Sequence, residues 1–195
     1  MTRLQNGQSF PALTVPAIGG GTIQIPGTLR GSYGVVLFNR GAWCPYCQAQ
    51  LAGFQRASEK LAETGIKVVA LSVDDEATTV GTIEKFKLSF PLGHSADADK
   101  VAAVTGAYTN ETPRYLQATG FLLAPDGKIL NAVYSSGPIG RLVAEDVVGM
   151  VAYQASRTWE GKKRFKPTNA GVVIVWAQNR TRARNAWRNP ARPAD

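Results

Sequence analysis

Residues 33–48 read YGVVLFNRGAWCPYCQ, and most of the fold assignment rests on them. The apolar run GVVLF, residues 34–38, is typical of a short strand that is buried on both faces of a sheet. After a short loop, Pro45 fits the first turn of a helix, where its missing N–H costs nothing. The sequence therefore predicts a buried strand that leads into a helix over residues 45–61.

Cys44 and Cys47 lie at the start of this helix, and the chain has 2 cysteines in all. Two residues between them let both sulfurs lie in one turn, so the pair can form and break a disulfide. The free N–H groups and the dipole of a helix N-terminus stabilise a thiolate, the reactive form of cysteine. Arg40 either adds positive potential or is a solvated loop charge. The spacing favours redox chemistry over two small buried hydrophobic residues.

Metal binding is the other chemistry that paired cysteines suggest. Structural zinc takes four ligands, whereas this chain offers 1 histidine, His94, and no third cysteine. We therefore expect neither a metal nor an organic cofactor. His94 is interpreted as an ordinary loop histidine, with a general-base role as the alternative.

Strands and helices alternate along the rest of the chain, which predicts an α/β fold with a mixed central sheet flanked by helices. The two closing strands surround the turn signal Pro125-Asp126-Gly127. The expected elements are a hairpin at residues 12–16 and 22–25, a strand at 66–73, a helix at 74–86, a short edge at 90–92, a helix at 97–108, strands at 120–124 and 128–134, and a helix at 141–157.

The positive charge is concentrated at the end of the chain. Residues 1–156 contain 12 basic and 12 acidic residues, and residues 157–195 contain 10 and 2, for a net charge of +8. We expect one domain over residues 1–156 and a basic C-terminal extension over residues 157–195. Its arginines and tryptophans suit nucleic acid or anionic partners. Because no nucleic-acid-binding motif accompanies them, we favour a packed extension and do not expect nucleic acid. The segment GVVIVW, residues 171–176, is too apolar to stay exposed, so it should pack on its own domain or on a second subunit of a homodimer.

The sequence also bears on location. No stretch approaches the ~20 apolar residues that cross a membrane. The first ten residues, MTRLQNGQSF, contain no apolar core of a secretory signal. We expect a cytoplasmic protein with no membrane partner.

The stretch WCPYC, residues 43–47, resembles the active-site turn of thioredoxins, and CPYC alone matches glutaredoxins. From about residue 6 to 156 the chain resembles peroxiredoxins of the alkyl hydroperoxide reductase/thiol-specific antioxidant type. This resemblance implies a thioredoxin-like fold with an N-terminal β-hairpin, and a thiol peroxidase with an antioxidant role in cell redox homeostasis. An external reductant, either a thioredoxin-like protein or a small thiol, would complete its cycle. The matching segments are GQSFP at residues 7–11, LSVD at 71–74, FPL at 90–92, SAD at 95–97 and GFLLAPDGKI at 120–129.

The resemblance leaves the roles of the two cysteines open. Peroxiredoxins carry Phe-x-Pro-x-x-x-Thr-x-x-Cys, which, counted from Phe38, places Arg40 at the proline, Cys44 at the threonine and Cys47 at the peroxide-attacking cysteine. Phe54 falls where that family often has a helix phenylalanine, which supports this register. The thioredoxin register instead makes Cys44 the nucleophile and Cys47 the resolving thiol. We favour Cys44, because the first thiol of such a helix is usually the more exposed and faces the helix terminus directly.

A second departure concerns the activation of peroxide. Peroxiredoxins place an arginine three residues before the phenylalanine of a later strand, and that position is Ala118 here. Arg114 is the candidate substitute, while Pro113 stands either for the cis-proline of thioredoxins or for an ordinary loop proline. The candidate site residues are Cys44 and Cys47 as catalytic groups, with Arg40, Trp43, Pro45 and Arg114 in support.

Two alternatives to peroxide reduction stay open. The missing threonine and arginine favour a general disulfide reductase that acts on disulfide substrates. A redox-sensing binding protein that uses the basic residues 157–195 is the second alternative, and a salt-dependent interaction would support it.

Overall fold

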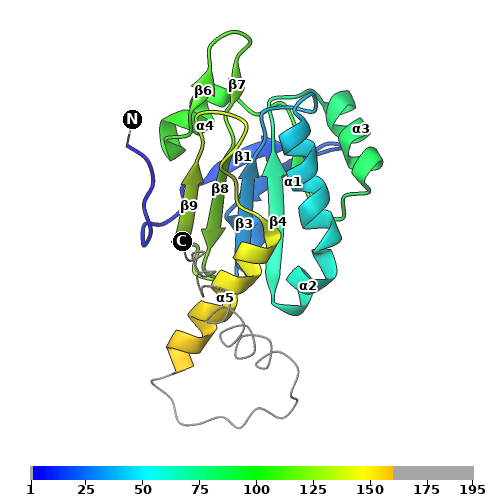
Figure 1. Cartoon of the computed structure of the whole chain (residues 1–195). Coiled ribbons are helices and arrows are strands. Elements are labelled where there is room, and N and C mark those ends of the chain that lie inside the picture. Colours follow the sequence, from blue (N-terminus) through cyan, green and yellow to red (C-terminus); the bar gives the residue numbers. More distant parts are fainter. Residues whose placement is uncertain (1, 160–195) are drawn as a thin grey trace, which may run out of the picture. The chain divides into compact units, whose positions relative to one another are not determined.

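The computed structural model describes residues 2–159. GVVIVW and the rest of the basic extension from residue 160 onward lie outside the described residues, so the expected division after residue 156 stays a prediction. The described elements (Figure 1) are β1 (Leu13–Pro16), β2 (Thr22–Ile25), the 3-10 helix η1 (Gly27–Leu29), β3 (Tyr33–Phe38), α1 (Pro45–Arg56), α2 (Ser58–Glu63), β4 (Ile66–Leu71), α3 (Glu76–Phe86), β5 (Leu92–Gly93), α4 (Ala98–Thr105), β6 (Thr109–Asn110), β7 (Tyr115–Leu116), β8 (Thr119–Leu123), β9 (Ile129–Tyr134) and α5 (Ala144–Trp159).

A five-stranded sheet with the order β5-β4-β3-β8-β9 forms the centre of the fold. β3 pairs in parallel with β4 and antiparallel with β8, so the expected mixed sheet is confirmed. Val36 of β3 lies between Val69 and Phe121 on the neighbouring strands. As predicted from its apolar run, β3 is buried on both faces, because alternate side chains enter two separate cores.

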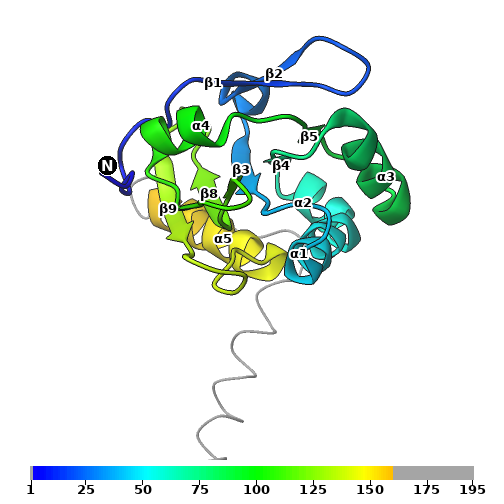
Figure 2. The same cartoon turned by 90° about the horizontal axis from the view of Figure 1, so that it is seen from above.

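The two faces of the sheet are covered by different elements, as Figure 2 shows from above. α1, α2 and α5 pack on one face through Leu51, Leu61 and Val147, among others. The β1–β2 hairpin and α4 pack on the other, with Ile25 and Val101 in that core. The expected α/β architecture with an N-terminal hairpin is therefore confirmed.

α1 begins at the cysteine pair. Pro45 occupies its first position, and Cys44 is the N-cap residue. The buried residues Cys47, Leu51 and Phe54 recur at helical spacing, so one face of α1 lies against the sheet. The single helix expected over residues 45–61 is two helices, because α1 ends at Arg56 and α2 begins at Ser58.

Sequence analysis did not predict the short β6–β7 hairpin, in which Asn110 pairs with Tyr115. It comes directly before β8 and lies beyond one end of the sheet (Figure 1). Strands of two residues carry too little periodicity to be recognised from sequence alone. No helix in the described part of the chain is long and apolar enough to cross a membrane.

Candidate active site

Four segments that are distant in sequence converge at one edge of the sheet (Figure 1). Because β3 and β4 are parallel, the loops that follow them emerge on the same side. β8 runs antiparallel to β3, so it begins on that side, and β9 ends there. The sheet thereby gathers the cysteine loop after β3, Asp74 after β4, Tyr115 before β8 and Arg141 after β9.

The two thiols lie against each other at the start of α1. Both cysteines are free, with relative exposures of 0% for Cys44 and 1% for Cys47. The Cys47 thiol donates a hydrogen bond to the sulfur of Cys44. The greater solvent exposure expected for Cys44 is absent, since both side chains are covered, although Cys47 lies deeper among protein atoms. Position in the helix, not accessibility, therefore distinguishes them.

Arg40 contacts both sulfurs from the loop after β3. Its backbone N–H donates to Cys47 Sγ at 3.2 Å, and its Nη1 lies 3.6 Å from Cys44 Sγ. Its Nη2 donates to the Tyr115 hydroxyl at 2.9 Å. The guanidinium thus lies in the site, as the first of the two interpretations of Arg40 expected.

Arg141 is a site residue that sequence analysis missed. Its Nη2 lies 3.0 Å from Cys47 Sγ and 3.8 Å from Cys44 Sγ. Its Nη1 donates to Gln50 Oε1 at 2.7 Å, and its Nε donates to the Pro138 carbonyl at 2.7 Å. Gln50 lies on α1 close to one turn beyond Cys47, so this bond fixes the guanidinium against the helix that carries the thiols. The one signal in the sequence was an arginine between the last strand and the last helix.

The surroundings of the two sulfurs shift their pKa values in opposite directions. Burial raises the pKa of Cys44, but hydrogen bonds from Cys47 and Arg40 and the charge of Arg141 outweigh it, so the net shift is downward. Burial also raises the pKa of Cys47, and the charge of Arg141 and the Arg40 N–H only partly offset it. Cys47 has the nearer donors, yet its deeper position in the helix decides the direction. Cys44 is therefore the thiol that ionises first.

The loop before the cysteines is held by Asp74. Its Oδ2 accepts the Ala42 N–H at 2.8 Å and the Ser72 hydroxyl at 3.0 Å. Gly41 has a φ of +145°, and a Cβ there would lie 2.4 Å from Nε1 of the Trp43 indole. Only glycine fits this position, because any side chain would displace the Trp43 ring.

Trp43 and Tyr46 flank Cys44 and are half exposed, at 55% and 51%. The Trp43 ring meets the Tyr115 ring edge-on, with centroids 5.2 Å apart. The guanidinium of Arg40 lies 4.9 Å from the Trp43 ring centroid. Trp43 thus packs on Arg40 and Tyr115 beside the thiols, while Pro45 starts the helix.

Comparison with known proteins assigns the chain that carries this site to a family. The model of the AhpC/TSA family matches residues 6–132, which is more than half of the chain. The chain belongs to the AhpC/TSA family. It is 27% identical over 158 residues to a peroxiredoxin of Treponema denticola, and the match covers 77% of this chain and 74% of the relative.

Two further comparisons bear on this AhpC/TSA chain. A crystal structure of a mutant of peroxiredoxin 6 of Arenicola marina superposes with a TM-score of 0.71 at 18% identity, covering 87% of this chain and 80% of that one, which shows the shared fold. The thiol-disulfide oxidoreductase ResA of Oceanobacillus iheyensis is 28% identical over 110 residues, covering 56% of this chain and 53% of the relative.

Arg114, the expected substitute for the family's arginine, does not reach the cysteines in this AhpC/TSA chain. It is exposed, and its guanidinium forms ion pairs with Asp99 and Glu111. Pro113 does follow a cis peptide bond, but it lies in the turn between β6 and β7. The ion pairs hold Arg114 at this turn, whereas Arg141, from the loop after β9, brings a guanidinium to the thiols.

Other candidate features lie away from the thiols. The Nδ1 of His94 lies 3.0 Å from the Ser95 hydroxyl, with no contact to either cysteine. Among residues 2–159 no group of three or more His, Cys, Asp or Glu side chains is placed to hold a metal ion.

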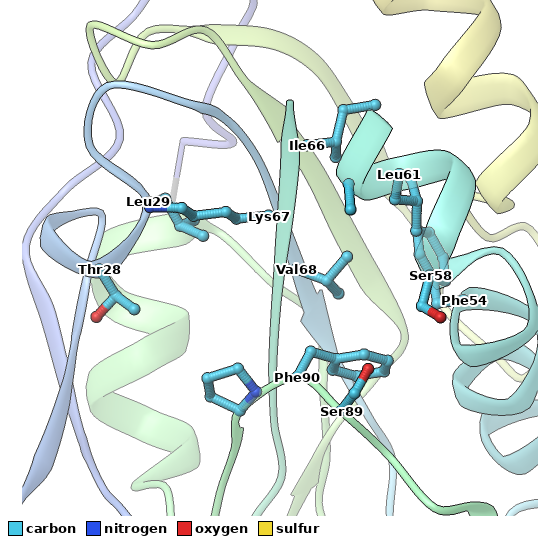
Figure 3. Close-up of a pocket in the computed structure, with 12 residues that line it drawn as sticks. Thr28, Leu29, Phe54, Ser58, Leu61, Ile66, Lys67, Val68, Ser89 and Phe90 are labelled. Carbon is cyan, nitrogen blue, oxygen red and sulfur yellow. The ribbon is translucent and has the colours of Figure 1, made fainter. Parts of the chain in front are cut away.

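Two hollows in the described part of the chain differ in their relation to the site. The first, of about 10 Å³, is lined by Cys47, Asp74 and Thr79 and is too small for any substrate larger than water. The second, of about 370 Å³, lies along β4, between Leu29 and Phe90 (Figure 3), and contains neither cysteine.

Proposed function

We propose that this chain is a thiol peroxidase that reduces hydroperoxides with the electrons of the Cys44–Cys47 dithiol. One observation carries the proposal. In a chain of the AhpC/TSA family, two buried thiols contact each other and also contact the guanidinium groups of Arg40 and Arg141. The group so assembled contains a nucleophile, a resolving thiol and two positive charges.

The first step is nucleophilic attack by the Cys44 thiolate. Its sulfur forms a bond to one oxygen of ROOH, the O–O bond breaks, and the departing RO⁻ takes up a proton as ROH. Cys44 is thereby oxidised to a sulfenic acid. Lowering the pKa of Cys44 makes the thiolate available near neutral pH.

Arg40 and Arg141 assist this step electrostatically. Donors already fixed beside the sulfurs stabilise the thiolate and the negative charge that develops on the leaving oxygen. They take the place of the threonine and arginine of the peroxiredoxin pattern, whose positions hold Cys44 and Ala118 here.

Cys47 resolves the sulfenic acid in the second step. Its sulfur attacks that of Cys44, the S–O bond breaks, water leaves and the Cys44–Cys47 disulfide forms. Both residues lie in the first turn of α1, so the helix need not unwind. An external thiol, from a thioredoxin-like protein or a small molecule, then supplies two electrons to restore the pair. We also propose a cytoplasmic location, a role in redox homeostasis and a homodimer as the assembly.

A general disulfide reductase is the second candidate function. The likeness to the ResA protein favours it, as does the CxxC pair at a helix N-terminus. In this reaction Cys44 would attack a disulfide sulfur of the substrate, and Cys47 would release the mixed disulfide. The redox-sensing alternative depends on residues 157–195, whose loss should abolish a salt-dependent interaction.

Rapid mixing of the reduced protein with hydrogen peroxide and with an organic hydroperoxide tests the proposal. The wild type should oxidise rapidly, as monitored by tryptophan fluorescence, and lose two thiols. Cys44→Ser should abolish this reaction, whereas Cys47→Ser should stop at a sulfenic acid that a dimedone-type reagent traps on Cys44. Trapping on Cys47 in the Cys44→Ser variant instead would assign the nucleophile to Cys47. A reaction with peroxide no faster than that of a free thiol would refute the peroxidase proposal and leave disulfide reduction as the candidate function.

A further inference from the structure

The hydroxyl of Tyr115 contacts the site without touching either sulfur. Tyr115 is the first residue of β7, and 8% of it is exposed. Its hydroxyl accepts a hydrogen bond from Arg40 Nη2 at 2.9 Å, across 75 residues of sequence. The other terminal nitrogen of the same guanidinium, Nη1, lies 3.6 Å from Cys44 Sγ. A guanidinium is planar, so fixing one of its nitrogens fixes the direction of the other.

The other contacts of the Arg40 guanidinium are with aromatic rings, and they do not determine which of its nitrogens faces Cys44. Its centre lies 4.9 Å from the Trp43 ring centroid and 5.3 Å from the Tyr115 ring centroid. Within residues 2–159, no carboxylate forms an ion pair with Arg40. Ring faces attract a cation without selecting which nitrogen points where. The directional bond that orients the group toward Cys44 is therefore the one to the Tyr115 hydroxyl.

We propose that Tyr115 is a positioning residue: its hydroxyl holds Arg40 so that Nη1 faces Cys44 and stabilises the thiolate there. The unpredicted β6–β7 hairpin thereby has a function, since it carries this hydroxyl to the edge of the sheet where α1 begins. The inference rests on the proposed function only in that the Cys44 thiolate is the reacting group.

Tyr115→Phe is the direct test, because it removes the hydroxyl and keeps the ring that packs on Trp43. The measurement is the titration of the Cys44 thiolate by its ultraviolet absorbance in the Cys47→Ser background, where Cys44 is the single thiol. The titration midpoint should move to higher pH, and the alkylation rate at neutral pH should fall about tenfold, as loss of a hydrogen bond to a charged group implies. An unchanged midpoint would overturn the inference.

Tyr134→Phe is the matched control. This tyrosine also packs against the core, and its hydroxyl donates to the Thr105 carbonyl at 2.7 Å and bonds to the backbone of Leu4, not to Arg40 or either sulfur. Its loss should lower stability and leave the titration midpoint of Cys44 unchanged. An equal shift in both variants would show that general loosening of the fold moves the midpoint, and would also overturn the inference.

A double-mutant cycle separates positioning from direct action. Arg40→Met should raise the midpoint at least as far as Tyr115→Phe, and adding Tyr115→Phe to Arg40→Met should have no further effect. Additive effects would mean that Tyr115 acts without Arg40. These readouts use an alkylating reagent and no peroxide. A protein without peroxidase activity whose midpoint still shifts would refute the proposed function alone, whereas an active peroxidase with an unshifted midpoint would refute this inference alone.

Discussion

Arg141 Nη2 lies 3.0 Å from Cys47 Sγ although 94 residues of sequence separate the two. The contact spans the fold from the loop after β9 to the first turn of α1. The same guanidinium donates to Gln50, so its orientation is fixed by the helix that it serves. The electrostatics of the dithiol therefore depend on the correct placement of the last strand.

Replacing Arg141 with Met should slow the reaction of the protein with peroxide by about 10²-fold, the usual effect of losing one donor to a developing anion. The pKa of Cys44 should rise, because the Arg141 charge helps to lower it. Rapid-mixing kinetics and thiol titration measure both. Arg114→Met is the matched control: its exposed ion pairs lie away from the thiols, so the rate should stay within about twofold. A comparable loss in the control would restore Arg114 to the site.

The two thiols should differ in the pH dependence of alkylation. In Cys47→Ser the rate should reach half its maximum at a lower pH than in Cys44→Ser, because the Arg40 bond and the Arg141 charge still act on Cys44 and burial still raises the pKa of Cys47. Iodoacetamide kinetics between mildly acidic and alkaline pH measure both midpoints. Reversed midpoints would assign the first ionisation to Cys47 and support the peroxiredoxin register.

The lowered pKa of Cys44 also links stability to pH. The ionised thiol is stabilised in the fold, so its contribution is fully present above the pKa of the unfolded thiol and is lost as pH falls through the lower folded value. Urea unfolding of Cys47→Ser, in which Arg40 and Arg141 still favour the thiolate of Cys44, should therefore show a free energy of unfolding that rises between the folded pKa and pH ~8.5. The variant that lacks both thiols should not show this rise in that interval.

Gly41→Ala should disturb the site although Gly41 itself does not contact either sulfur. A Cβ at residue 41 would lie 2.4 Å from Nε1 of the Trp43 indole, and the backbone there has φ of +145°. We expect a stability loss of about 1–3 kcal/mol from backbone strain and a slower reaction with peroxide as Trp43 moves away from Arg40. Gly53→Ala, inside α1, should instead be neutral or stabilise by up to about 1 kcal/mol. Wild-type kinetics in Gly41→Ala would contradict this account.

Phe121→Ala should destabilise the sheet strongly. Its ring is fully buried and meets those of Phe10, Phe38 and Tyr134 at centroid distances of 5.0, 5.6 and 5.5 Å. Removing such a ring costs about 3–5 kcal/mol, measured by denaturant unfolding. Val104→Ala, at an exposed position of α4, should stay within about 0.5 kcal/mol of the wild type. A mild effect of Phe121→Ala would mean that the core collapses around the lost ring.

The strand and helix around the cysteines could be predicted because local signals agree there. An apolar run specified β3, and Pro45 marked the start of α1. The helix over residues 141–157 was also expected and lies at Ala144–Trp159. These features depend on neighbouring residues, so sequence patterns report them directly.

The rest of the site could not be predicted, because it depends on contacts across the sheet. Tyr115 and Arg141 meet the thiol loop only through the pairing of β3 with β8 and of β8 with β9. Sequence analysis chose Arg114 because it lay near the family position, but the side chain there turns to Asp99. Whether Arg114 or Arg141 reaches the thiols depends on how the strands are paired, and no local sequence pattern reports that pairing.

The separation between the cysteine loop and its partners has a consequence for biosynthesis. On the ribosome, Tyr115 is added 75 residues after Arg40, and Arg141 is added 94 residues after Cys47. At ~5–20 residues per second, each interval lasts for several seconds. Throughout it the nascent chain carries cysteines without the Arg141 charge. The arrangement of charges around Cys44 and Cys47 is therefore complete only when translation has passed the last strand.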